Sequence, residues 1–102
     1  MMISRLGAFL RKPEYADRIP HGFEYELKRL YYEIANSANK PAIAALTSLV
    51  PTTQIMFGTD YPFVPVGATA NGMKTVGLSD SDLKAIGWET ASHLLGMRDL
   101  AR

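Results

Sequence analysis

The chain has 102 residues, of which 47% are hydrophobic and 21% charged, and its formal net charge is +1. This length allows one small domain, and the charge balance supplies no basic surface of the kind that binds nucleic acid. Cysteine is absent, which excludes disulfides and thiolate metal sites. No apolar run reaches the ~20 residues needed to cross a bilayer, and the first residues are too polar for a signal peptide. We therefore expect a cytoplasmic protein without a membrane or nucleic-acid partner.

The N-terminal part is predicted to form a helix followed by a loop. Apolar residues recur at helical spacing over residues 3–11, and Pro13 ends the pattern. Proline and glycine punctuate the following residues 13–23, which contain His21. A lone histidine in a loop is more often a solvated side chain than a metal ligand or a catalytic group.

Residues 23–35 fit two structures. Phe23, Leu27 and Leu30 recur with the period of a helix, whereas residues 30–34 are aromatic and β-branched in part, as in a strand. Periodicity alone leaves both alternatives open. The helix that follows has clearer limits, because Asn39 is a good N-cap and Pro51 stops it.

A short buried strand is predicted over Ile55, Met56 and Phe57, because a continuous apolar run is typical of a parallel strand covered on both faces. Gly58 allows another backbone to approach closely, and the proline at position 62 prevents a central strand from continuing. Asp60 is therefore expected at the carboxyl end of the strand. In parallel α/β folds, ligands and catalytic groups gather at that edge of the sheet.

The remaining residues are predicted to form a long loop and a last helix. Residues 64–77 contain one proline and three glycines, and a loop of this length is either functional or a simple connector. Ser79 is a suitable N-cap for the helix and Gly96 a suitable C-cap. His93 falls outside the apolar stripe and is expected on the helix surface. The predicted stripe is made of Leu83, Ile86, Gly87, Thr90, Ala91, Leu94 and Leu95.

The segment from Met56 to Phe63 resembles the last-strand motif of the amidohydrolase-related family of metal-dependent (β/α)8-barrel enzymes. That family includes aminocarboxymuconate-semialdehyde decarboxylase and related aromatic-acid decarboxylases. Leu30–Ala35 resembles the preceding barrel strand, where the family usually has Asp at the position of Glu33. Residues 77–96 resemble the closing helix, although Glu-Thr-Ala replaces the usual Gly-Asn-Ala turn. The resemblance covers roughly residues 20–97.

The resemblance implies an α/β fold in which residues 24–28 form a helix and residues 30–34 a strand. Residues 30–63 are then a strand–helix–strand unit, whose right-handed crossover makes the two strands parallel. A complete barrel needs about 250 residues. We therefore predict that residues 1–102 are a single incomplete domain, equivalent to the C-terminal quarter of a barrel. It would comprise the last two strand–helix units, with two parallel strands and three to four helices.

The resemblance also implies that Asp60 is a catalytic residue and binds or adjoins a divalent metal, usually zinc. The family's histidine ligands match neither His21 nor His93, and a catalytic zinc site needs about three protein ligands. We therefore expect this chain alone to bind no metal and to be inactive. Glu33 is expected at the same sheet edge as Asp60, either pointing to the barrel mouth or pairing with a cation.

Two functional hypotheses follow. In the first, the chain is a fragment of an amidohydrolase-like hydrolase or decarboxylase that acts on a small molecule. In the second, it is a non-enzymatic α/β module that oligomerises, or a subunit that complements a separate chain carrying the missing strands. Open strand edges invite pairing with other chains, so both hypotheses predict an assembly, most simply a homo-oligomer completing the partial barrel.

Overall fold

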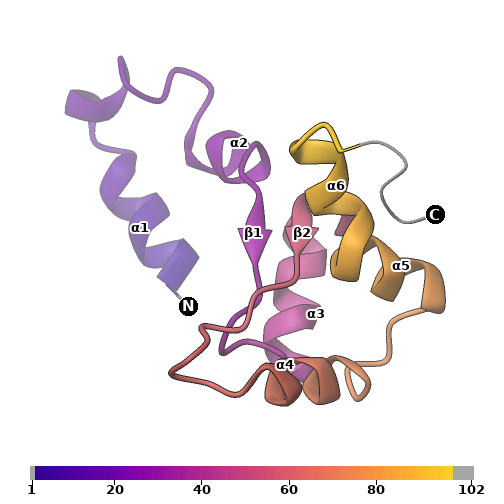
Figure 1. The fold of residues 1–102 in the computed structure, drawn as a ribbon. Coiled ribbons are helices and arrows are strands. Elements are labelled where there is room, and N and C mark those ends of the chain that lie inside the picture. The colour runs from indigo at the N-terminus through magenta and orange to yellow at the C-terminus, as the bar shows by residue number, and fades with distance from the viewer. Residues whose placement is uncertain (1, 98–102) are drawn as a thin grey trace. The chain divides into compact units, whose positions relative to one another are not determined.

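The computed structural model describes residues 2–97 and shows a mixed α/β chain (Figure 1). The chain divides into two compact units, Met1–Leu30 and Tyr31–Arg102. No helix within residues 2–97 is long and apolar enough to cross a membrane.

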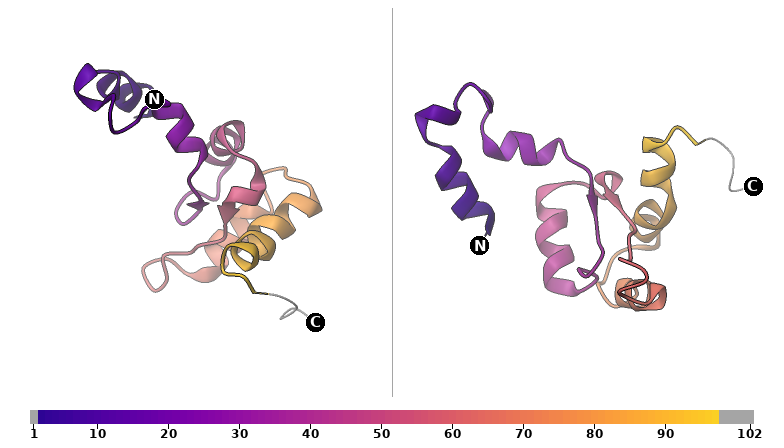
Figure 2. Two further views of the ribbon diagram at one scale, coloured as in Figure 1. Left: turned by 90° about the horizontal axis from the view of Figure 1, so that it is seen from above. Right: turned by 60° about the vertical axis from the view of Figure 1, so that its left-hand side comes forward.

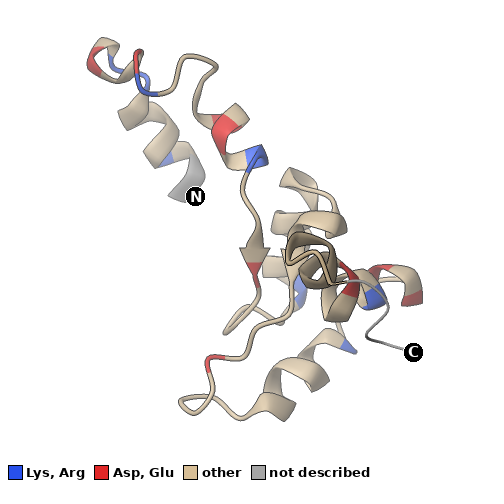
Figure 3. Ribbon diagram, turned by 45° about the horizontal axis from the view of Figure 1, so that its top comes forward, with Lys and Arg blue, Asp and Glu red and all other residues tan. Residues whose placement is uncertain are grey.

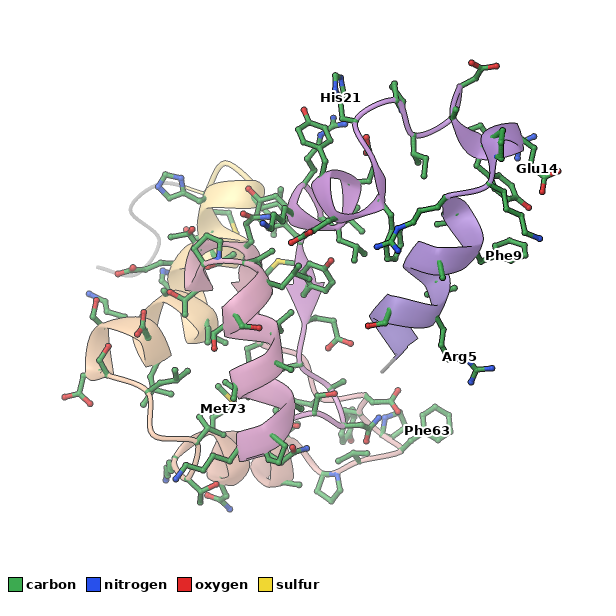
Figure 4. The ribbon with its side chains drawn as sticks, turned by 180° about the vertical axis from the view of Figure 1, so that it is seen from behind. Arg5, Phe9, Glu14, His21, Phe63 and Met73 are labelled. Carbon is green, nitrogen blue, oxygen red and sulfur yellow. The ribbon has the colours of Figure 1, made fainter. Side chains whose placement is uncertain are left out.

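The first unit is helical. Both predicted helices are present, as α1 (Met2–Leu10) and α2 (Phe23–Lys28), and a short 3-10 turn, η1 (Pro13–Tyr15), lies within the predicted loop. The two helices pack closely because Gly7 has no side chain: a Cβ there would lie 3.1 Å from the Phe23 ring. At the end of α1, the rings of Phe9 and Tyr15 lie 5.4 Å apart, and Arg5 projects away from the helix (Figure 4).

The second unit contains a two-stranded parallel sheet, which confirms the predicted strand–helix–strand order. Tyr32 pairs with Ile55 and Glu33 with Met56, so the paired segments are shorter than residues 30–34 and 55–57 of the prediction. Figures 1 and 2 show the strands side by side, with α3 and the α5–α6 helix beside them and α4 beyond their carboxyl ends. The elements are β1 (Tyr32–Glu33), α3 (Lys40–Leu49), η2 (Thr52–Gln54), β2 (Ile55–Met56), α4 (Val66–Met73), α5 (Asp80–Lys84), η3 (Ala85–Glu89) and α6 (Thr90–Leu94).

Helices cover one face of this sheet. Ile34 and Ile55 are 0% exposed and belong to an apolar cluster with side chains from α3, α4 and η3. Successive residues of a strand point to opposite faces, and on the other face Glu33 is exposed and Met56 only half-buried. Phe57 is also 36% exposed. The prediction of a strand covered on both faces is therefore wrong, because two strands and their helices supply only one covering layer.

The predicted helix starts are confirmed by their side-chain caps. The Asn39 side chain accepts a hydrogen bond from the Ala42 N–H at 3.0 Å, at the start of α3. The Ser79 hydroxyl accepts one from the Asp82 N–H at 3.1 Å, at the start of α5. Gly96 has a φ of 67°, the left-handed conformation expected of a C-terminal glycine.

The predicted long loop over residues 64–77 is wrong, because Val66–Met73 form α4. Two glycines made a helix improbable by propensity, but Thr69 and Met73 are buried, and tertiary packing overrides the propensity. Gly72 is required by that packing, since a Cβ there would collide with the Ala38 carbonyl.

The predicted last helix is interrupted by a π-helical segment, η3. The Thr90 N–H donates to the carbonyl of Ala85, five residues earlier. Within this wider turn the Ile86 carbonyl accepts a hydrogen bond from the Phe57 N–H at 2.9 Å, which joins the helix to the end of β2. The apolar stripe is displaced as a result: Ala85 and Ile86 are buried side by side, whereas Leu94 and Leu95 of the predicted stripe are 48% and 71% exposed.

Candidate site at the strand ends

Asp60 lies in a tight turn shortly after β2, as the sequence predicted. Its φ of 60° is left-handed, a conformation that aspartate tolerates better than most residues. The Asp60 carbonyl accepts hydrogen bonds from the N–H groups of Phe63 and Val64 at 2.9 and 3.2 Å. This turn, which includes a cis Tyr61–Pro62 peptide bond, holds the Asp60 side chain at the surface.

Asn36 occupies the equivalent place after β1 and contacts Asp60 directly. Its φ of 59° is also left-handed, and its Nδ2 donates to Oδ2 of Asp60 at 3.2 Å. The loops that follow the two strands therefore meet through this hydrogen bond. Asn36 was not among the predicted site residues, although asparagine is favoured in left-handed turns and its position after the strand was a usable signal.

Glu33 lies on the exposed face of β1. Its Oε2 accepts a hydrogen bond from the Ala35 N–H at 2.8 Å, and a Cβ at Gly58 would collide with its carboxylate. The expected close approach at Gly58 is therefore made by a side chain, not by a backbone. Figure 3 draws acidic residues in red, and red segments lie on a strand of the sheet and on the loop beyond the strands.

A small polar cavity adjoins the Asn36–Asp60 contact. Its volume is about 250 Å³, and it lies between the loop after β1 and the start of α4. Its lining combines amide, hydroxyl and aliphatic groups, which suits a small polar ligand. The lining residues are Asn36, Ala38, Asn39, Val64, Ala68 and Thr69.

Two aromatic side chains project from the loop that carries Asp60. Tyr61 is 72% exposed and Phe63 is 85% exposed, and Phe63 points away from the fold in Figure 4. Aromatic side chains are costly to leave in water. The loop that carries Asp60 thus presents apolar surface next to the carboxylate.

His21 belongs to the first unit and His93 to α6, so neither is part of the loops that carry Asn36 and Asp60. His21 is exposed in the first unit, with its ring 4.8 Å from that of Tyr25 (Figure 4). His93 is exposed on α6, as predicted. Within residues 2–97, no group of three His, Cys, Asp or Glu side chains is arranged to hold a metal. A single carboxylate does not make a catalytic metal site, so the described residues alone do not fit one.

Comparisons with known proteins give a match to one family profile and to solved structures. The sequence matches the amidohydrolase family profile over residues 7–97. No curated protein matches the chain.

Two solved structures share the fold. A dihydroxybenzoic acid decarboxylase from Polaromonas sp. JS666, solved with bound manganese and the inhibitor 2-nitroresorcinol, is 22% identical with a TM-score of 0.63; the match covers 84% of this chain and 24% of that one. A protein from Staphylococcus aureus assigned as an amidohydrolase is 20% identical with a TM-score of 0.72, covering 90% of this chain and 30% of that one. The chain thus matches part of an amidohydrolase barrel, and spans less than a third of either protein.

Proposed function

Because the chain belongs to the amidohydrolase family, we propose that it forms the last two strand–helix units of a metal-dependent hydrolase or decarboxylase and contributes Asp60 to the active site. The observation that carries the proposal is the exposed Asp60 carboxylate, held by Asn36 at the carboxyl edge of a parallel sheet. Catalytic residues of barrel enzymes gather at that edge.

Asp60 and Asn36 are the residues of this chain that would act in the reaction. Asp60 holds or moves a proton at its carboxylate, as a general base within reach of a substrate or water does. Asn36 donates to Oδ2, which orients the carboxylate. The decarboxylase structure was solved with bound manganese, and a divalent metal held beside Asp60 would lower the pKa of its bound water.

We further propose that the other protein ligands of a divalent metal come from strands outside this chain, and that the chain alone is inactive. The described residues provide no three-ligand group, and the sheet has two strands, whereas a closed barrel of this type has eight. In a closed barrel the missing strands would continue the sheet at its edges, and the face that carries Glu33 and Met56, which the helices leave uncovered, would point into the interior.

Assembly with other chains is part of the proposal. At the edge of β2 the Ile55 and Phe57 N–H groups donate to the carbonyls of Thr52 and Ile86, so a strand that continued the sheet there would have to replace these contacts. A partner would also cover the open sheet face and the aromatic side chains of the Asp60 loop. The partner is either a second copy of this chain or a separate chain carrying the missing strands; the first case also fits a non-enzymatic module.

The substrate class follows only from the relatives. One similar structure is a dihydroxybenzoic acid decarboxylase, and the polar cavity beside Asn36 has room for a small polar group. We propose a small carboxylated compound, bound at the strand ends.

Metal binding and native mass test this proposal. Zinc and manganese titrated into the purified chain by calorimetry should show no stoichiometric, submicromolar site, and light scattering should give a mass above that of one chain. A tight site that Asp60→Ala abolishes and the control Asp80→Ala preserves would contradict the proposed incompleteness. A monomer at micromolar concentration would contradict self-assembly.

Purification of the tagged chain from its native source tests the role of Asp60. We expect a complex that contains a divalent metal by elemental analysis, with metal occupancy lowered by Asp60→Asn and unchanged by Asp80→Asn. If the metal occupancy of the complex is the same with Asp60→Asn as with the unaltered chain, Asp60 is not part of the metal site.

A further inference from the structure

A second cavity lies on the helical side of the sheet, between β2, α4, α5 and η3. Its volume is about 210 Å³, and its lining includes none of Glu33, Asn36 and Asp60. The walls are made mainly by Phe57, Met73, Leu83 and Ile86, so the interior is apolar.

Two of the residues that form the walls of this cavity belong to the buried core. Met73 and Ile86 are 6% and 1% exposed and belong to the core cluster; Figure 4 shows Met73 among the side chains between the helices. The hydrogen bond from Phe57 N–H to the Ile86 carbonyl, at 2.9 Å, joins two of the walls. These contacts fix the positions of three wall residues, which lowers the cost of ordering them around a ligand.

The size and lining select a small aromatic or aliphatic group. Apolar cavities of about 150 Å³ bind benzene, so a cavity of about 210 Å³ has room for one substituted ring. Gly87 leaves one wall open, because a Cβ there would meet nothing within 4 Å. A π-helical segment lines the site, and such segments frequently occur at functional sites.

Lys74 adds a charge to this lining. It is exposed and lines the cavity, and the ion pairs formed among residues 2–97 involve other cations, namely Lys28, Arg29 and Lys84. The Lys74 side chain is long enough to bring its ammonium group to the mouth of this apolar cavity, which favours an apolar molecule that carries one negative charge.

We propose that this cavity binds a small aromatic monocarboxylate, with its ring against Phe57, Met73 and Ile86 and its carboxylate on the Lys74 ammonium. The site is separate from Asp60, and its occupation does not depend on the function proposed there. A ligand that binds only the folded chain stabilises it by mass action.

Benzoate and benzyl alcohol form a matched pair of probes, because they share the ring and differ in charge. In amide NMR titrations of the whole chain, we expect benzoate at millimolar concentration to shift the amides of the lining residues. Lys74→Gln should weaken benzoate binding by about fivefold or more and leave benzyl alcohol unchanged. Lys40→Gln, which removes a lysine outside this lining, is the matched control and should change neither.

Filling the cavity provides an independent test. Gly87→Leu adds a side chain at the open wall of the cavity and should abolish the binding of both probes. The amide spectrum far from the cavity should stay unchanged. If that variant fails to fold, the comparison of Lys74→Gln with Lys40→Gln decides alone. Benzoate shifts that are absent, that lie outside the lining, or that persist with equal affinity in Lys74→Gln would each overturn the proposal.

Discussion

The two faces of the β1–β2 pair differ in what they do for the protein. The helical face carries Ile34 and Ile55, both fully buried, and holds most of the core. The opposite face carries Glu33 and Met56, with Gly58 kept free of a side chain beneath the Glu33 carboxylate. Stability is therefore concentrated on one face, which leaves the other face and the strand ends available for a site or a partner.

Truncation on each face provides the sharpest test of this difference. Ile55→Ala should lower the free energy of unfolding by about 3 kcal/mol, because it leaves a cavity in the core. Met56→Ala, on the half-buried face, should cost less than about 1.5 kcal/mol by area lost. Urea denaturation followed by circular dichroism measures both, and equal losses would show that the second face is packed as well as the first.

The packing of α4 gives the next largest effect. Gly72→Ala should destabilise the chain by about 2 kcal/mol, because the added methyl group collides with the Ala38 carbonyl and the backbone must move. Gly67→Ala, in the same helix, meets only the Asn71 amide nitrogen at 3.9 Å. It should stabilise by up to about 1 kcal/mol through helix propensity. Thermal unfolding of the pair distinguishes them, and the same sign for both would contradict the close approach.

The strand ends should respond more weakly. Asn36→Ala removes the hydrogen bond to Asp60 and places alanine in a left-handed conformation, which together should cost about 1 to 2 kcal/mol. Asn36→Gly removes the same hydrogen bond but tolerates the conformation, so it should cost less. If glycine and alanine cost the same in chemical denaturation, the backbone conformation at this position carries no strain.

The smallest expected effect is a dependence on alkaline pH. Burial raises the pKa of the Tyr32 hydroxyl above its ordinary value. The folded chain therefore holds this proton more tightly than the unfolded chain, and stability is lost as the pH rises above about 10. Tyr32→Phe should lose stability less steeply over that range in denaturant midpoints measured as a function of pH. An identical slope in the variant would contradict the assignment to Tyr32.

Local signals predicted much of the fold correctly. Asn39 and Ser79 each mark a helix start because their side chains cap backbone N–H groups within three residues. The position of Asp60 after a short apolar strand also followed from local residues. Helix α4 did not, because its glycine-containing sequence becomes helical through the burial of Thr69 and Met73 against distant segments.

The sequence by itself indicated the family, the helix starts and the candidate residue Asp60, because caps, apolar runs and the motif over Met56–Phe63 are local patterns, and the family resemblance then implied the strand–helix–strand order. Only the tertiary structure brought Asn36 to Asp60, across 24 positions of the chain, and produced the π-helical turn that binds the end of β2. These features depend on hydrogen bonds and packing between segments far apart in the chain, and no local pattern encodes such contacts.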